Sequence, residues 1–307
     1  MQSDRDTIEL AVPPDFGLPQ AVPAGTVLVT GAGGQLGMDV MRVAAAAGIA
    51  AVGLDREALD ITDAADVQRV MEACSPNAVI HCAAWTAVDD AEERESDASR
   101  VNGEGTHNVA RAAEACGARL VAVSTDYVFS GSAVDGYRED DETDPINAYG
   151  RSKLAAERAT AEHPNAVIAR TAWLFGEHGP NFVRTIARLA TERPSIDVVT
   201  DQVGSPTWTM HLARALLECA AGSMTGVVHL AGTPVATWHD VASEVVHQMG
   251  IACEVRPTTS EAFPRPAARP ACSILQVTRA ETPAVGDWRE GVSAVLASYA
   301  ATGSSRA

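Results

Sequence analysis

Tyr149 and Lys153 stand four residues apart in the segment Tyr149-Gly150-Arg151-Ser152-Lys153. On a helix this spacing places both side chains on one face, one turn apart. A free tyrosine has a pKa of about 10 and is a poor acid or base near neutrality, but a neighbouring ammonium lowers it. Tyr149 is therefore a candidate proton donor to a carbonyl oxygen whose carbon accepts a hydride. Lys153 would support it and bind the ribose of a nicotinamide cofactor.

A glycine-rich turn lies far upstream, in the segment Gly31-Ala32-Gly33-Gly34-Gln35-Leu36-Gly37. Gly31, Gly34 and Gly37 are spaced three apart, between an expected strand and an expected helix. One glycine permits the tight turn, one lets backbone amides approach a pyrophosphate, and one allows the helix to lie close to the strand. The helix N-terminus adds partial positive charge. The segment has no lysine, which argues against a P-loop nucleotide site.

Two further positions at strand ends could hold ligands. Asp55 ends the second expected strand, where a carboxylate can accept hydrogen bonds from adenosine ribose hydroxyls and so favour NADH. Arg56 follows directly and could contact a 2′-phosphate, which would admit NADPH, or lie in a solvated loop. Thr125 and Ser124 end a later strand, and Thr125 could orient the reacting carbonyl. A helix or turn cap is the alternative role, more credible for Ser124.

The elements expected to position these residues alternate regularly. Short apolar strands are predicted at residues 26–30, 50–54, 78–82, 119–124 and 166–171, separated by helices at 36–47, 64–73, 91–116 and 148–162. This pattern is typical of an α/β fold with a doubly wound parallel Rossmann sheet covered by helices on both faces. Beyond residue 171 turns containing proline become frequent, which predicts a smaller C-terminal substrate-binding region. Its elements are expected as helices at 182–190, 207–221 and 238–250 and strands at 196–199 and 227–230.

These elements suggest a division of the chain. Residues 1–24 are expected to be a flexible leader and residues 25–170 an NAD(P)-binding Rossmann domain, to which segments near 206–235 return. Residues 171–302 are mainly the substrate-binding region, and residues 303–307 a frayed tail.

Composition excludes several functions. The 307 residues carry a formal charge of −17 and are 46% hydrophobic, so nucleic acid and anionic membranes are poor partners. The six cysteines have no short-spaced pairs, which favours buried thiols in a reducing compartment over disulfides or a metal site. No apolar run is long enough to span a bilayer, and the first 24 residues lack the pattern of a signal peptide. We expect a cytoplasmic protein.

Taken together, the motifs resemble dTDP-4-dehydrorhamnose reductases, a family of extended short-chain dehydrogenases. The resemblance covers residues 25–296. Besides the glycine turn and the Tyr149–Lys153 segment, it rests on the segments Ala83–Asp89 (AAWTAVD), Ser124–Phe129 (STDYVF), Arg170–Trp173 (RTAW), Asp201–Thr207 (DQVGSPT) and Arg269-Pro270. It implies NADPH- or NADH-dependent reduction of the 4-keto group of dTDP-4-dehydro-6-deoxy-L-mannose to dTDP-L-rhamnose, with NADPH favoured.

The resemblance also implies residue roles. Tyr149 would be the catalytic acid, supported by Lys153 and Thr125. Cofactor contacts would come from Gly31, Gly34, Gln35, Leu36, Asp55, Asp60, Ile61, Ala83, Ala84, Trp85, Tyr149 and Lys153. Substrate contacts would come from Thr86, Thr125, Asp126 and Trp173. Arg184, Arg188 and Arg269 are candidates for the substrate diphosphate.

The sequence departs from the family at one site. Some bacterial members bind Mg²⁺ at a dimer interface through glutamates, and the corresponding positions here hold Asp39, Met210 and Arg289. A thioether is a poor ligand for a hard cation and an arginine repels one. We therefore predict no structural Mg²⁺ and either a monomer or a homodimer.

Two other functions are compatible with these features. The same chemistry could serve a related nucleotide sugar, such as the dihydrostreptose precursor of an antibiotic pathway. A non-catalytic dinucleotide-binding regulatory subunit is the third reading, which the complete set Thr125, Tyr149 and Lys153 argues against.

Overall fold

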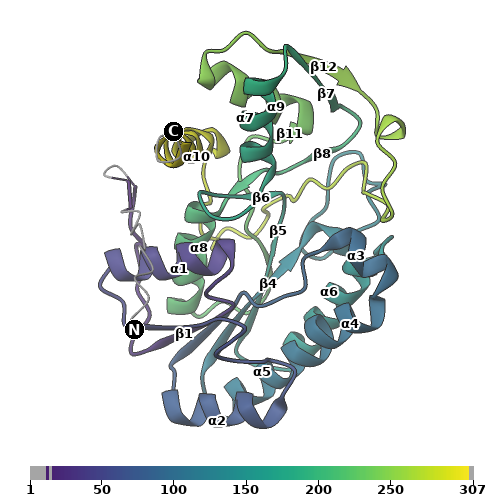
Figure 1. Ribbon diagram of the computed structural model, residues 1–307. Coiled ribbons are helices and arrows are strands. Elements are labelled where there is room, and N and C mark those ends of the chain that lie inside the picture. The colour runs from purple at the N-terminus through teal and green to yellow at the C-terminus, as the bar shows by residue number, and fades with distance from the viewer. Residues whose placement is uncertain (1–11, 14–15, 304–307) are drawn as a thin grey trace, which may run out of the picture.

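The computed structural model describes residues 12–13 and 16–303, and its centre is a parallel sheet of six strands (Figure 1). The strand order is β2-β1-β3-β4-β5-β10, and every neighbouring pair is parallel. The strands are β1 (Val27–Thr30), β2 (Ala51–Leu54), β3 (Ala78–His81), β4 (Arg119–Thr125), β5 (Ala166–Thr171) and β10 (Gly226–His229). The predicted doubly wound Rossmann sheet is confirmed. The order reverses between β1 and β3, and such a switch point is where ligands bind in these sheets.

Helices cover both faces of this sheet, as Figure 1 shows. On one face α1 (Gln35–Ala46) packs against α8 (Thr209–Ala221). On the other lie α2 (Ala64–Cys74), α5 (Gly105–Ala115) and α6 (Ala148–Ala161). Because successive strand residues point to opposite faces, Val27 and Val29 join the core under α1 and α8, while Leu28 joins the core under α2 and α5. All three are fully buried, which explains why the strand has no polar alternation.

The single helix predicted at residues 91–116 is wrong. The chain instead forms α3 (Val88–Glu93), α4 (Glu95–Ser99), the π-helical turn η1 (Arg100–Glu104) and α5. The break lies at Arg94, between α3 and α4. The backbone of Arg94 is not helical (φ −128°, ψ 42°), and its guanidinium binds Asp97 at 2.8–2.9 Å. The apolar pattern persists across the break, so periodicity alone does not show it.

The C-terminal region adds three short two-stranded pairings at one end of the sheet (Figure 1). They are β6 (Leu174–Phe175) with β9 (Thr207–Trp208), β8 (Val203–Gly204) with β11 (Ala236–Thr237), and β7 (Ser195–Val199) with β12 (Glu254–Thr258). Helices α7 (Phe182–Glu192) and α9 (Trp238–Met249) pack together beside them. A last helix, α10 (Trp288–Gly303), packs on both and was not predicted. The short 3-10 turns η2 (Asp126–Val128) and η3 (Ser260–Ala262) complete the described elements.

Only part of the expected leader and tail lies within the described residues. Residues 1–11, 14–15 and 304–307, which make up much of the expected leader and tail, lie outside the described residues. In the described part of the leader, Phe16 stacks on His211 of α8 at 5.9 Å and meets Trp208 edge-on at 5.9 Å. Gln20 N–H donates to the Glu218 carboxylate at 3.1 Å. Residues 16–20 thus have specific contacts on α8 that the prediction of a flexible leader does not include.

No helix within residues 12–13 and 16–303 is both long and apolar enough to cross a membrane.

Candidate active site

A cavity of about 1050 Å³ opens at the carboxyl ends of the central strands. It runs from the turn after β1, past the ends of β2, β3 and β4, to the start of α9. Apart from the three arginines considered for the diphosphate, every residue predicted to bind cofactor or substrate or to act in catalysis lines it: Gly31, Gly34, Gln35, Leu36, Asp55, Asp60, Ile61, Ala83, Ala84, Trp85, Thr86, Thr125, Asp126, Tyr149, Lys153 and Trp173. The fold therefore gathers segments that are far apart in the sequence into one site.

The glycine turn has no room for side chains at two of its positions. Gly31 has φ +70°, and a Cβ on it would lie 2.6 Å from the backbone nitrogen of Ala83, which follows β3. A Cβ on Gly37 would lie 2.2 Å from the Gly31 carbonyl oxygen. These two positions need glycine for the turn and for the close approach of α1. Gly34 is the N-cap of α1 and no side chain caps the helix, so the amides of its first turn remain available at the cavity.

The adenosine side of the cavity contains both acidic and basic groups. Asp55 Oδ1 accepts hydrogen bonds from the amides of Glu57 and Ala58 at 3.0 Å, which fixes the carboxylate at the end of β2. Arg56 and Arg100 also line this part of the cavity. Arg100 comes from η1 and donates to Thr62 Oγ1 at 3.0 Å. The sequence offered no signal for Arg100, because it lies within the stretch predicted as one uniform helix.

Tyr149 and Lys153 project from α6 toward the end of β4. Lys153 Nζ donates to the Val123 carbonyl oxygen at 2.7 Å, and both Tyr149 and Lys153 are buried. The Asn147 side chain caps α6 by accepting from the Gly150 amide at 2.7 Å, which sets where the helix begins. Tyr149 lies edge-on to Tyr127 with ring centroids 5.7 Å apart. The helical geometry expected from the sequence is confirmed.

The pKa of Tyr149 moves upward in this structure, opposite to the direction expected from a neighbouring ammonium. Burial raises the pKa of Tyr149, the charge of Asp126 raises it further, and a hydrogen bond with Thr125 only partly opposes them. Lys153 has itself lost much of its solvation, and burial lowers its pKa to about 8 even though Glu157 favours its charged form. Desolvation outweighs the neighbouring charges at both groups. Tyr149 thus keeps its proton at neutral pH, the form required of an acid.

Thr125 and Asp126 lie where β4 passes into η2. Thr125 Oγ1 donates to Asp126 Oδ1 at 2.9 Å and accepts from the Tyr127 amide at 3.2 Å. Burial raises the pKa of Asp126 to about 6, against hydrogen bonds from Ser273 and Thr125. The Thr125 hydroxyl is thus also a turn cap, which is the alternative role considered from the sequence. Thr125 lines the same cavity as Tyr149.

Two tryptophans form the opposite wall. Trp173 stacks on Trp238 with centroids 3.7 Å apart and the rings 4° from parallel. Trp173 has φ +48°, a strained value for a residue with a side chain, and its indole lies where a Cβ on Gly204 would be 2.5 Å away. Trp238 Nε1 donates to Gln202 Oε1 at 3.1 Å. Sequence reasoning missed Trp238, because nothing but the C-terminal topology brings α9 to this cavity.

The segment that follows β3, which includes Trp85, is held by the side-chain amide of Asn102. Trp85 N–H donates to Asn102 Oδ1 at 2.8 Å, and Asn102 Nδ2 donates to the Trp85 carbonyl at 3.1 Å and to Ser152 Oγ at 2.8 Å. Asn102 is buried and belongs to η1. The π-turn thus joins the Ala84–Thr86 segment to the helix that carries Tyr149 and Lys153.

The three arginines considered for the diphosphate lie elsewhere. Arg184 donates to the Glu177 carbonyl and Arg188 pairs with Glu192. Arg269 pairs with Asp89 at 2.7 Å. None of the three lines the cavity.

The positions compared with a magnesium site have other partners. Asp39 is fully buried and accepts from Thr209 Oγ1 at 2.5 Å and Arg42 Nη1 at 2.8 Å. Met210 is buried, and Arg289 pairs with Asp287. Across the described residues no group of three or more His, Cys, Asp or Glu side chains could hold a metal ion.

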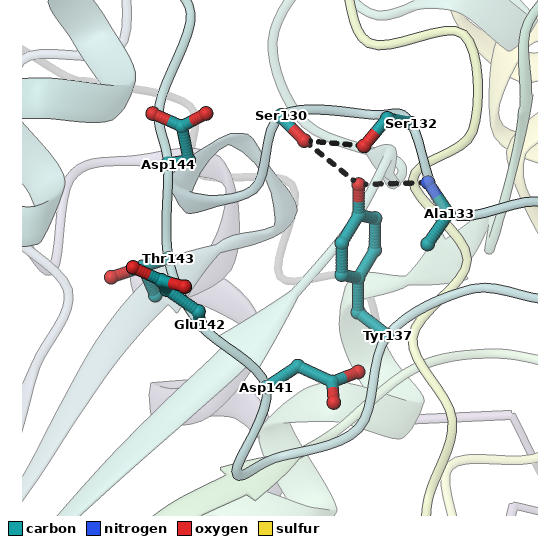
Figure 2. Close-up of a pocket in the computed structure, with 8 residues that line it drawn as sticks. All are labelled: Ser130, Ser132, Ala133, Tyr137, Asp141, Glu142, Thr143 and Asp144. Atoms are coloured by element: carbon teal, nitrogen blue, oxygen red, sulfur yellow. Dashed lines mark hydrogen bonds between the residues drawn. The ribbon is translucent and has the colours of Figure 1, made fainter.

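A second, more open hollow of about 500 Å³ lies between residues 130–133 and 141–144 (Figure 2). The Tyr137 hydroxyl points to its rim, where it accepts from the Ala133 amide at 3.1 Å and bonds Ser130 Oγ at 3.2 Å. The ring of Tyr137 stacks on Phe129 at 4.1 Å. This tyrosine therefore fixes the loop before α6 and takes no part in the catalytic cavity.

Comparison with known proteins decides the family. The family described as RmlD substrate binding domain matches residues 25–301. The chain belongs to this family. A dTDP-4-dehydrorhamnose reductase of Streptomyces griseus is 44% identical, with 82% of this chain and 86% of the relative covered. A dTDP-4-keto-6-deoxy-D-glucose reductase of Streptomyces niveus is 40% identical over 81% of this chain and 87% of the relative.

Solved structures agree with the membership in the RmlD family. The crystal structure of a dTDP-4-dehydrorhamnose reductase from Bacillus anthracis in complex with NADP has a TM-score of 0.85 and 38% identity, covering 89% of this chain and 99% of that chain. This agreement includes the Rossmann sheet and the C-terminal region together.

Proposed function

We propose that this protein is an NADPH-dependent oxidoreductase that reduces the 4-keto group of dTDP-4-dehydro-6-deoxy-L-mannose to give dTDP-L-rhamnose. The observation that carries the proposal is the meeting of Thr125, Tyr149 and Lys153 with the glycine turn in one cavity, in a member of the RmlD family. Relatives covering most of the chain are named for this reaction.

The cavity residues suit a nicotinamide dinucleotide. The uncapped amides at the start of α1, from Gly34 to Leu36, would hold its pyrophosphate. Asp55 would accept from the adenosine ribose, beside Asp60 and Ile61. Arg56 and Arg100 favour the 2′-phosphate of NADPH, and a relative's structure contains NADP. Ala83, Ala84 and Trp85 would lie beside the nicotinamide, which supplies the hydride when bound.

The protein's own part in the reaction is proton transfer and orientation. The Tyr149 hydroxyl donates its proton to the substrate carbonyl oxygen, which becomes the product hydroxyl. Its raised pKa ensures that the proton is present at neutral pH. Thr125 holds the same oxygen, and the Lys153 ammonium binds the cofactor ribose and favours the tyrosinate that remains. Thr86, Asp126 and Trp173 contact the nucleotide sugar.

A related nucleotide sugar is the second candidate substrate. The relative from Streptomyces niveus is named for dTDP-4-keto-6-deoxy-D-glucose, and it matches this chain nearly as well as the first relative does. The dihydrostreptose precursor belongs to the same chemical class. The catalytic side chains act only on the carbonyl, so they do not distinguish these sugars.

The testing experiment follows NADPH absorbance with dTDP-4-dehydrorhamnose and with dTDP-4-keto-6-deoxy-D-glucose, each with NADPH and NADH, and identifies the product by NMR. We expect oxidation of NADPH with the first sugar and formation of dTDP-L-rhamnose. Turnover of only the second sugar would change the substrate, and cofactor binding without any turnover would favour a regulatory subunit.

The division of labour along the chain is part of the proposal. Residues 25–170, with 206–235, bind the dinucleotide, and the remainder of 171–302 binds the sugar nucleotide. We further propose action in the cytoplasm, as a monomer or homodimer, without nucleic-acid or membrane partners. The charge of −17 supports the last point. Sedimentation velocity would establish the oligomeric state.

A further inference from the structure

A buried ion pair lies directly behind the catalytic pair. Glu157 of α6 and Arg170 of β5 form a two-pronged contact, with Nε to Oε1 at 2.9 Å and Nη2 to Oε2 at 2.8 Å. Their side chains are only 6% and 4% exposed. Burying two charges is costly unless their remaining hydrogen-bonding capacity is used. The remaining donors of Arg170 are satisfied: Nη1 donates to the Glu139 carbonyl at 3.3 Å, and the guanidinium lies over the face of Phe129 at 4.9 Å.

The Glu157 carboxylate accepts its further hydrogen bond from the side of the cavity. Ser124 Oγ donates to Glu157 Oε1 at 2.6 Å, and Ser124 lines the cavity next to Thr125. Glu157 also stands four residues after Lys153 and eight after Tyr149, so all three side chains fall along one side of α6. Lys153 binds the carbonyl of Val123, the residue before Ser124. The Glu157 carboxylate thus binds Ser124 of β4, directly next to the residue whose carbonyl oxygen binds Lys153.

We propose that Glu157 is a positioning residue for catalysis, which holds Lys153 as an ammonium and Ser124 in place at the cavity. Arg170 neutralises part of the negative charge of Glu157 and so limits its effect on Lys153. This inference rests on the proposed function only in assigning Lys153 to the cofactor ribose. Neither Glu157 nor Arg170 touches the cavity, so both act through Lys153 and Ser124.

The charges around Lys153 give the direction of the effect. Glu157 is the strongest group that favours its charged form. Cys82, which follows β3, is a neutral thiol where Lys153 titrates, because burial raises its pKa to about 12. The other ionisable groups nearby are His81 at the end of β3, Tyr149 on α6, Asp126 in η2 and Arg170 on β5. Burial keeps His81 neutral by lowering its pKa to about 3. Glu157 is therefore the main group that offsets the burial of the ammonium.

The experiment measures NADPH affinity against pH, by the fluorescence of bound NADPH, in the wild type and in two opposite charge variants. Because the pKa of Lys153 is about 8, we expect wild-type affinity to fall as pH rises through that value. Glu157→Gln removes the negative neighbour, so the midpoint should move to lower pH by about one pH unit. Arg170→Met removes the positive neighbour, so its midpoint should move to higher pH.

Stability provides the second arm. Each single variant leaves a buried group unpaired and can reduce folding, whereas the double variant Glu157→Gln/Arg170→Met removes both charges and should fold. Its midpoint should move to lower pH by less than that of Glu157→Gln. Ser124→Ala should leave the midpoint unchanged and lower turnover.

Midpoints that stay fixed, or that move in the same direction in both single variants, would overturn the inference. A wild type without a midpoint near pH 8 would do so as well. Wild-type protein that shows the expected midpoints but reduces no sugar would instead refute the proposed function alone.

Discussion

The hydroxyl of Tyr149 can be removed with little change to its surroundings. Tyr149→Phe keeps the ring, which lies edge-on to Tyr127 and is buried, and deletes only the oxygen that bonds Thr125. Loss of one such bond changes the free energy of unfolding by about 1 kcal/mol at most, since a desolvated polar group is removed with it. Loss of the proton donor should lower kcat about 100- to 10,000-fold, which corresponds to about 3–5 kcal/mol of transition-state stabilisation.

The assay is NADPH oxidation at saturating sugar nucleotide, with NADPH affinity and thermal unfolding measured in parallel. Tyr127→Phe is the matched control, because Tyr127 lines the same cavity and makes the same ring contact. Affinity for NADPH and thermal stability should remain close to the wild type in both variants. If Tyr149→Phe kept more than a tenth of the turnover, or if Tyr127→Phe lost as much, the assignment of the acid would be refuted.

Three further predictions concern the turn, the cofactor and acid stability. Gly37→Ala should lower the free energy of unfolding by about 1–3 kcal/mol and weaken NADPH binding, because its Cβ would lie 2.2 Å from the Gly31 carbonyl; urea unfolding and fluorescence titration measure both. Arg100→Ala should weaken NADPH about tenfold or more and leave NADH affinity unchanged, as titration with each cofactor would show. As the pH is lowered from 6.5 to 5, the free energy of unfolding measured with urea should fall by up to about 3 kcal/mol per pH unit. Burial lowers the pKa of three histidines in the folded protein, so the unfolded chain binds protons first: His81 (to about 3), His211 (to about 4) and His229 (to about 4). The buried Asp126 carboxyl partly offsets them, because its pKa is raised to about 6 and it takes up a proton in the folded protein.

Each of these predictions has a control or a contrary outcome. Gly222→Ala, where a Cβ would make only ordinary contacts, should be nearly neutral. Arg69→Ala removes an exposed arginine on α2, which pairs with Asp66 away from the cavity, and should spare NADPH affinity. An equal loss of NADH and NADPH affinity in Arg100→Ala would show that Arg100 does not read the 2′-phosphate. Stability that is flat between pH 6.5 and 5 would contradict the neutral, buried state of the histidines.

Local patterns predicted the strands and the glycine turn well. Val27, Leu28 and Val29 are apolar because both faces of the sheet are covered, and Gly31 and Gly37 are needed because no side chain fits there. These requirements are local and leave a clear trace in the sequence. The same holds for the helical spacing of Tyr149 and Lys153.

Features set by long-range packing escaped prediction. The break at Arg94 is not visible in the apolar periodicity. The π-turn at η1 is held by the contacts of Asn102 with Trp85 and Ser152, which a periodicity does not contain either. Trp238 reaches the cavity only through the C-terminal topology. The pKa of Tyr149 was given the wrong direction because spacing shows which charges are near but not how far the site is removed from water.

The return of β10 and α8 to the central sheet affects how this chain can be divided. A fragment ending at residue 170 would lack the strand that covers β5, whose residues are all buried in the whole protein. It would also leave the apolar face of α1 without α8. An uncovered strand edge beside an exposed apolar face is a template for association between chains. The dinucleotide half, expressed alone, should therefore aggregate, and a soluble minimal version must carry residues 206–235 joined to it.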